Sequence, residues 1–312
     1  HDGLAQGNFP RTLPLNSIAV GALKVISPPA GFSQANVDSL LKNLNLGPVL
    51  NAILATTGAA RVVTRDRDRR ILSRKQVVAE HFNTSTEPEG HGFTPQNRIN
   101  GTAYYTFDVG AHIRMVVMDT VNPNGYADGS LDKAQFTWLK NTINNSADKL
   151  VILFSHHTSG TMNNPLIGTG GTLSSRVVGS TLVKYLLTKP QVIAWVNGHT
   201  HRHEIIAHSN GSGGGFWEIN TASHIDFPQQ ARIIEIADNG DATLSIFTTI
   251  LDHAAPAAVD YNDLDDPLKL AALSRELSAN DWQHIDTGTA ADLNTELILK
   301  APQGYLNAVN AP

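Results

Sequence analysis

Four histidines in two short segments are the residues of this sequence best suited to chemistry. His199 and His201 stand one residue apart in the segment NGHTH, and His156 and His157 are adjacent in the segment FSHHT. Residues two apart in an extended backbone point to one face. We therefore expect His199 and His201 to share a face, and only one of His156 and His157 to join them. Imidazole ligands without sulfur suit Zn, Fe, Mn, Ni or Co.

The segments around these histidines are predicted to bring them together. Residues 150–154 and 192–196 are continuous apolar runs, typical of strands buried on both faces, and each run ends just before a histidine pair. A segment over 113–118 is rich in β-formers and ends at Asp119. Helical patterns separate the three strands, and such a series makes a parallel sheet whose strands end at one edge. We expect a metal site at that edge, where Asp119 either caps the end of its strand or supports a ligand or the substrate.

The other segments are predicted to build up the sheet and a second one. Ser130 is expected to cap the first intervening helix. His203 and His208 are expected on a solvated hairpin, and His224 and Asp226 between strands, orienting a ligand or bonding within their loop. We predict further strands over 104–109, 204–207, 216–221, 231–236 and 243–250, helices over 34–46, 49–57, 174–188 and 268–278, and a loop over 83–101.

The composition excludes several classes of protein. The 312 residues carry a formal net charge of −5, with 41% hydrophobic and 16% charged residues, so the chain is not disordered as a whole. A mildly acidic chain is a poor candidate for nucleic-acid binding, which needs a basic face. The absence of cysteine excludes disulfides and thiolate ligands. No apolar run approaches the ~20 residues of a membrane span.

The segments FSHHT and GHTH, each after an apolar strand, resemble the last two motifs of the binuclear metallophosphoesterases, or calcineurin-like phosphoesterases. The resemblance implies a mixed α/β fold with two sheets packed face to face and helices outside. It also implies two metal ions (Fe, Mn or Zn), His156 and His199 holding one and His201 the other. The activity implied is hydrolysis of a small phosphate ester, as a phosphatase or phosphodiesterase, by in-line attack of a metal-activated hydroxide.

The start of the chain matches the same family. His1-Asp2 corresponds to the end of its G-N-H-D motif, so the resemblance makes His1 a catalytic group near the phosphoryl and Asp2 its orienting partner. The earlier motifs, D-x-H and G-D-x-x-D, are not in the sequence. We therefore expect this chain to be a C-terminal half that requires an N-terminal fragment of the same protein for activity. The segment GGFWEINTASHIDFPQQARIIEI resembles an exported bacterial branch of the family, which implies an exported protein.

The resemblance also suggests how the chain is divided. Residues 1–10 are the remnant of the third motif, and residues 11–102 are an insertion of helices and loops that we expect to form a cap over the site. Residues 103–250 are the C-terminal half of the phosphoesterase domain, and residues 251–312 a linker and helical tail.

The sequence leaves three alternative hypotheses of function open. His199, His201 and Glu204 loosely resemble the single-metal site of a cupin, which would be all-β. A free amine at His1 with a second histidine could bind copper in a β-sandwich. The third alternative is a half-domain without catalysis that serves as a binding or assembly module.

Overall fold

The computed structural model describes residues 72–122, 127–166, 174–281 and 287–311. The chain divides into two compact units. One unit comprises His1–Tyr105, Val117–Trp138 and Met162–Thr181, and the other comprises Thr106–Val116, Leu139–Thr161 and Leu182–Pro312. His1, Asp2 and the helices predicted over 34–46 and 49–57 lie outside the described residues.

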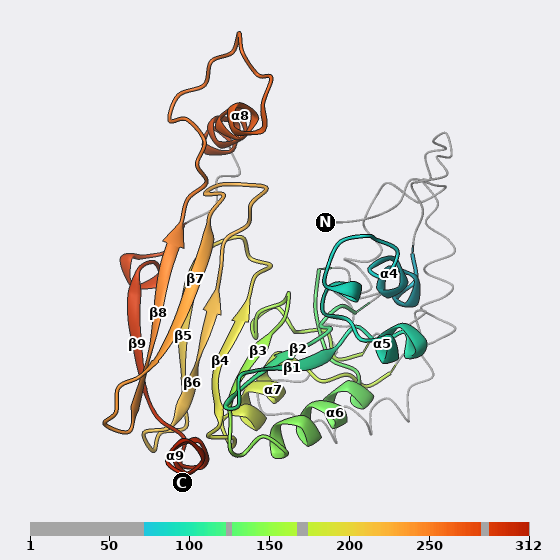
Figure 1. The fold of residues 1–312 in the computed structure, drawn as a ribbon, viewed down its shortest axis with the longest axis vertical. Helices are drawn as coiled ribbons and strands as arrows, with labels where there is room; N and C mark the ends of the chain where they lie inside the picture. Colours follow the sequence, from blue (N-terminus) through green and yellow to red (C-terminus); the bar gives the residue numbers. More distant parts are fainter. Residues whose placement is uncertain (1–71, 123–126, 167–173, 282–286, 312) are drawn as a thin grey trace. The chain divides into compact units, whose positions relative to one another are not determined.

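The larger sheet has the strand order β1-β2-β3-β4-β6-β5 (Figure 1). Its strands are β1 (Tyr105–Val109), β2 (Ile113–Val117), β3 (Leu150–Phe154), β4 (Val192–Asn197), β5 (Glu204–Ser209) and β6 (Gly215–Asn220). β3 is parallel to β4 and β4 is parallel to β6, whereas β5 runs antiparallel to β6. The carboxyl ends of β3, β4 and β6 therefore lie at one edge, as the apolar runs predicted for the first two.

The smaller sheet is antiparallel and has the order β7-β8-β9. Its strands are β7 (Ala231–Asp238), β8 (Thr243–Leu251) and β9 (Thr295–Lys300). The turn between β7 and β8 contains Asn239-Gly240, and Gly240 has a φ of 73°, a conformation that suits glycine. This hairpin was predicted, whereas β9 was not.

One hydrophobic core joins the two sheets. Its buried members from the larger sheet include Leu150, Ile152, Ile193 and Ile219, and those from the smaller sheet are Leu244, Ile246 and Leu297. Burying each such side chain contributes about 1.5–3 kcal/mol of transfer free energy. The two sheets thus pack face to face, and the predicted mixed α/β class with two sheets is confirmed.

Two helices connect the first strands of the site. α6 (Lys133–Asn144) precedes β3, and α7 (Gly179–Leu186) precedes β4. The carboxyl-terminal parts of these helices lie together, since the Tyr185 hydroxyl donates to the Lys140 carbonyl at 3.4 Å, and Gln191 just after α7 donates to the Ile143 carbonyl at 2.9 Å. Their alternation with β2, β3 and β4 in the chain is the predicted β-α-β-α-β series.

The predicted cap of α6 is wrong. The helix begins at Lys133, and the carboxylate of Asp132 accepts a bond from the Gln135 backbone N–H at 2.7 Å. Ser130 instead lies buried before the helix, where its hydroxyl accepts a bond from the Arg176 guanidinium at 2.7 Å. A buried hydroxyl needs a hydrogen-bond partner, and Arg176, which is distant in sequence, provides it.

The remaining helices were only partly predicted. They are α4 (Arg74–Glu80), η1 (Glu89–Gly92), α5 (Pro95–Asn100), α8 (Pro267–Ala279), η3 (Ala290–Asp292) and α9 (Gln303–Val309). α8 matches the helix predicted over 268–278. The loop predicted over 83–101 contains α5, which has Thr94 and Asn97 as a capping box and Gly101 at φ 65° after its last turn. No helix among the described residues is both long and apolar enough to cross a membrane.

Candidate metal centre

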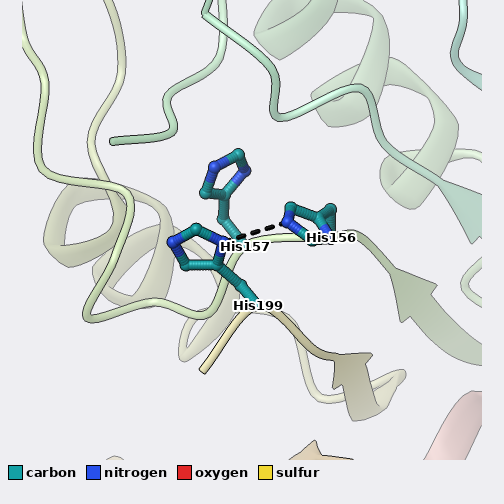
Figure 2. A group of neighbouring side chains, drawn as sticks. All are labelled: His156, His157 and His199. Carbon is teal, nitrogen blue, oxygen red and sulfur yellow. Dashed lines mark hydrogen bonds between the residues drawn. The ribbon is translucent and has the colours of Figure 1, made fainter. Parts of the chain in front are cut away.

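Three imidazoles meet at the edge where β3 and β4 end. His156 and His157 follow β3, His199 follows β4, and one ring nitrogen of each lies within 4.8 Å of the others (Figure 2). His199 Nδ1 and His156 Nε2 are 3.0 Å apart, a hydrogen-bonding distance for one protonated and one bare nitrogen. His157 is buried, His199 is half-buried and His156 reaches the surface. The topology therefore unites histidines 43 residues apart in sequence.

The backbone at these histidines differs from the extended form assumed from the sequence. His156 and His157 lie in a bend after β3, so both rings approach His199. His199 and His201 have φ values of 74° and 57°, in the left-handed region that L-residues seldom occupy. The prediction that assumed an extended backbone at these histidines, with only one of His156 and His157 at the site, is therefore wrong. Such strained conformations are frequent at ligand-binding positions.

The charge state of His156 suits a ligand. Desolvation by the surrounding protein lowers the pKa of His156, and the neighbouring His199 and His201 lower this pKa further. The neutral imidazole is therefore favoured near neutral pH, and the neutral form is the one that binds metals.

His201, on the same loop as His199, contacts a carboxylate from another segment. Its Nδ1 lies 2.5 Å from Oδ2 of Asp226, a residue of the segment that follows β6. A carboxylate that holds one ring nitrogen as a donor leaves Nε2 as the atom that can coordinate or accept a proton. His201 and Asp226 thus form an oriented pair, while His224, two residues earlier, is exposed.

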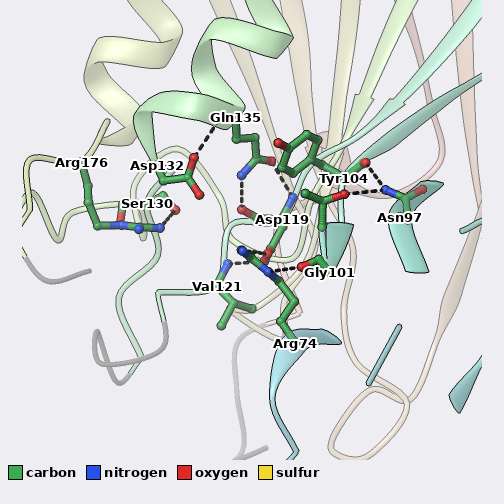
Figure 3. A network of polar contacts seen from close by, with 11 residues as sticks. Arg74, Asn97, Gly101, Tyr104, Asp119, Val121, Ser130, Asp132, Gln135 and Arg176 are labelled. Atoms are coloured by element: carbon green, nitrogen blue, oxygen red, sulfur yellow. Dashed lines mark hydrogen bonds and ion pairs between the residues drawn. The ribbon is translucent and has the colours of Figure 1, made fainter. Parts of the chain in front are cut away.

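Asp119 lies in the other compact unit and has its own contacts (Figure 3). One carboxylate oxygen pairs with Arg74 Nη1 at 3.0 Å, and the other accepts the Val121 backbone N–H at 3.1 Å. Gln135 bonds to both the backbone N–H and the carbonyl of Asp119. Through these contacts, Asp119 connects α4, the segment after β2 and α6 within that unit.

Two histidines expected in solvent are instead enclosed. His203 is fully buried, with Nε2 at 3.0 Å from Gln230 Oε1 and Nδ1 at 3.1 Å from the guanidinium of Arg232 on β7. The side chain of His208 is 15% exposed, and its Nε2 lies 2.6 Å from a carboxylate oxygen of Glu218. The prediction of solvated positions is wrong because both side chains find polar partners within the fold.

The sequence did not single out the polar side chains beneath the histidine loops. Glu218 and Asn220 of β6 are both buried and bond to those loops. The available signal was a charged residue inside FWEIN, a segment otherwise typical of a buried strand.

Comparisons with known proteins find only distant likenesses, among solved structures. No family model matches the chain, and no curated protein matches it. Among solved structures, the chain is similar to a dimetal phosphatase from Danio rerio, with 12% sequence identity and a TM-score of 0.38. The similarity covers 56% of this chain and 64% of that one, so this chain spans less than two thirds of its length.

Proposed function

We propose that this chain carries part of the active site of a binuclear metal-dependent phosphoesterase acting on small phosphate esters. The observation that carries the proposal is the cluster of His156, His157 and His199 at the ends of two parallel strands. The motif order, FSHHT before GHTH, supports the phosphoesterase class over other metal-dependent chemistries. Export from the cell belongs to the same proposal and rests on the sequence resemblance alone.

The cluster has a donor set that fits such metals. Three imidazole nitrogens suit Zn, Fe or Mn. Two nitrogens bound to one zinc at about 2.0–2.1 Å each lie at most about 4.2 Å apart. The nitrogens of the cluster lie within 4.8 Å of one another, so small ring rotations suffice to bind one ion.

The residues divide between two metals in this proposal. His156 and His199 hold one ion, with His157 beside them, and Nε2 of His201 faces the other. The remaining ligands, and the catalytic His1 with its partner Asp2, come from outside the described residues. When bound, such a metal pair lowers the pKa of a coordinated water and stabilises the charge that develops on the phosphoryl oxygens.

The chain's own groups supply orientation and charge. Asp226 holds Nδ1 of the His201 ring, so that Nε2 is the single nitrogen presented to a ligand. The lowered pKa of His156 keeps this imidazole unprotonated, so no proton competes with its ligand role near neutral pH.

A single-metal site is the second candidate. His156, His157 and His199 form a three-nitrogen group without His201, as a mononuclear centre would require. The cupin alternative does not fit, because cupins are all-β and this fold is mixed α/β.

Hydrolysis assays on metal-loaded protein test the proposal. In protein that also contains the remaining ligands, we expect Mn²⁺, Fe²⁺ or Zn²⁺ to confer hydrolysis of p-nitrophenyl phosphate or its bis ester. His199→Asn should lower that activity by at least about 100-fold, since even residues that only orient ligands cost 10–100-fold. His81→Asn is the matched control, because His81 contacts the Val77 carbonyl in the other unit. Hydrolysis that His199→Asn leaves unchanged would contradict the proposal.

A further inference from the structure

Glu218 is a buried carboxylate of the larger sheet, on the strand between β4 and the edge strand β5. Its side chain is 1% exposed, on β6, opposite Trp195 of the neighbouring strand β4. A carboxylate removed from water is unfavourable unless hydrogen bonds compensate it. Replacing a buried ion pair with apolar side chains of similar size often stabilises a protein. The packing of the sheet alone therefore does not account for a charge at this position.

One oxygen of Glu218 joins the two loops that carry the histidine cluster. Oε1 accepts the backbone N–H of Ser159 at 2.7 Å and the side-chain amide of Asn197 at 2.8 Å. Ser159 follows His156 and His157 by a few residues, and Asn197 precedes His199 by two. The Gly198 backbone N–H also donates to the His156 carbonyl at 3.0 Å, so the two loops meet directly as well.

The second oxygen of Glu218 is held from the other side. Oε2 lies 2.6 Å from Nε2 of His208 on the edge strand β5. Burial raises the pKa of Glu218, but the bonds from His208, Ser159 and Asn197 outweigh this effect and hold its pKa below the usual range. The carboxylate is therefore ionised and has a fixed direction.

Asn220 makes a similar connection two residues further along β6. Its amide donates to the Arg202 carbonyl at 2.9 Å and to the Thr200 hydroxyl, both in the loop of His199 and His201. Residues two apart on a strand share a face, so Glu218 and Asn220 form a polar row beneath the histidine loops. Ile219, between them, is buried in the hydrophobic core on the opposite face.

We infer that Glu218 is a positioning residue of the metal centre, which sets the distance between the loop of His156 and His157 and the loop of His199. The inference rests on the proposed function, since it assigns those histidines to a metal. Groups that orient ligands are worth 10–100-fold in metal affinity. Glu218 acts one step further out, through the Ser159 backbone after His157 and the Asn197 side chain before His199.

Binding of Co²⁺ by the whole chain, followed by its visible absorption, tests this inference. In Glu218→Gln, the amide oxygen still accepts from Ser159 and Asn197 while its NH₂ group faces His208 Nε2. We expect this variant to keep the Co²⁺ spectrum and an affinity within tenfold of the unaltered chain. Glu218→Leu keeps the volume but no acceptor, and we expect its affinity to fall about 10–100-fold with an altered spectrum.

Two further variants separate positioning from stability. Ile219→Ala destabilises the same strand without touching the loops, so its Co²⁺ spectrum should stay unchanged. Asn197→Leu removes one of the two loop contacts, and this residue's buried Oδ1 has no partner to lose within the described structure. We expect Asn197→Leu to weaken Co²⁺ binding and shift the spectrum, even if Glu218→Leu does not fold.

The outcomes distinguish this inference from the proposed function. Unchanged Co²⁺ binding in Glu218→Leu or Asn197→Leu overturns the inference alone. An equal loss in Ile219→Ala also overturns it, because instability would then explain the effect. Absence of Co²⁺ binding by the unaltered chain overturns the metal proposal and this inference with it.

Discussion

His199 has a backbone φ of 74°, and this strain gives a prediction that separates fold from function. A left-handed conformation costs an L-residue about 1–2 kcal/mol, and glycine avoids the cost. Glycine loses about 0.5–1 kcal/mol more than alanine through the entropy of the unfolded chain. Both replacements remove the same contact between His199 and His156, so that term cancels. His199→Gly should therefore be more stable than His199→Ala by roughly 0.5–1 kcal/mol.

Urea unfolding of metal-free protein measures this difference. With a slope of about 2 kcal/mol/M, the midpoint of His199→Gly should lie about 0.2–0.5 M above that of His199→Ala. Thr200 is the matched control, because its φ is not positive, and there alanine should be the more stable replacement. Both variants at 199 should lose metal binding equally. An alanine variant at 199 as stable as the glycine variant would refute the left-handed geometry on which the bend of this loop depends.

Three further predictions follow from the polar contacts. Above an ordinary carboxyl pKa of about 4.3, ionised Glu218 stabilises the fold, and this stabilisation is lost as the pH falls through its lowered pKa. Urea midpoints measured from pH 6 to pH 3 should thus fall less steeply for Glu218→Gln than for the unaltered chain. An equally steep fall in both would count against the stabilising hydrogen bonds of the Glu218 carboxylate. Asp119→Asn should cost about 1 kcal/mol by weakening the partly exposed pair with Arg74, yet leave metal content unchanged, and loss of metal would place Asp119 in the site. Asp226→Asn should weaken metal binding about 10–100-fold by removing the charge that orients His201. Unchanged metal affinity in this variant would exclude that role for Asp226.

The strands and the edge they share were predictable from the sequence because buried parallel strands are continuous apolar runs. Residues 150–154 and 192–196 correspond to β3 and β4 within one residue, and the Asn-Gly turn marked the hairpin of β7 and β8. Since parallel strands end together, the chain order alone placed His156 and His199 at one edge.

The details of the site were less predictable because they depend on contacts far along the chain. The bend at residues 156–157 and the positive φ at His199 have no local signal apart from Gly198, so the extended geometry assumed for them was wrong. Ser130 looked like a helix cap but bonds to Arg176, a partner 46 residues away. β9 has alternating burial, and its place beside β8 depends on long-range pairing.

The number of metal ions per chain, measured by elemental analysis on the protein as isolated, tests the central claim most directly. The account predicts about two ions of Fe, Mn or Zn in the active protein, with marked loss in His199→Asn but none in His81→Asn. One ion per chain would favour the three-histidine mononuclear site over the binuclear one. A protein that binds no Fe, Mn or Zn, even when these metals are added, would contradict the metal centre altogether.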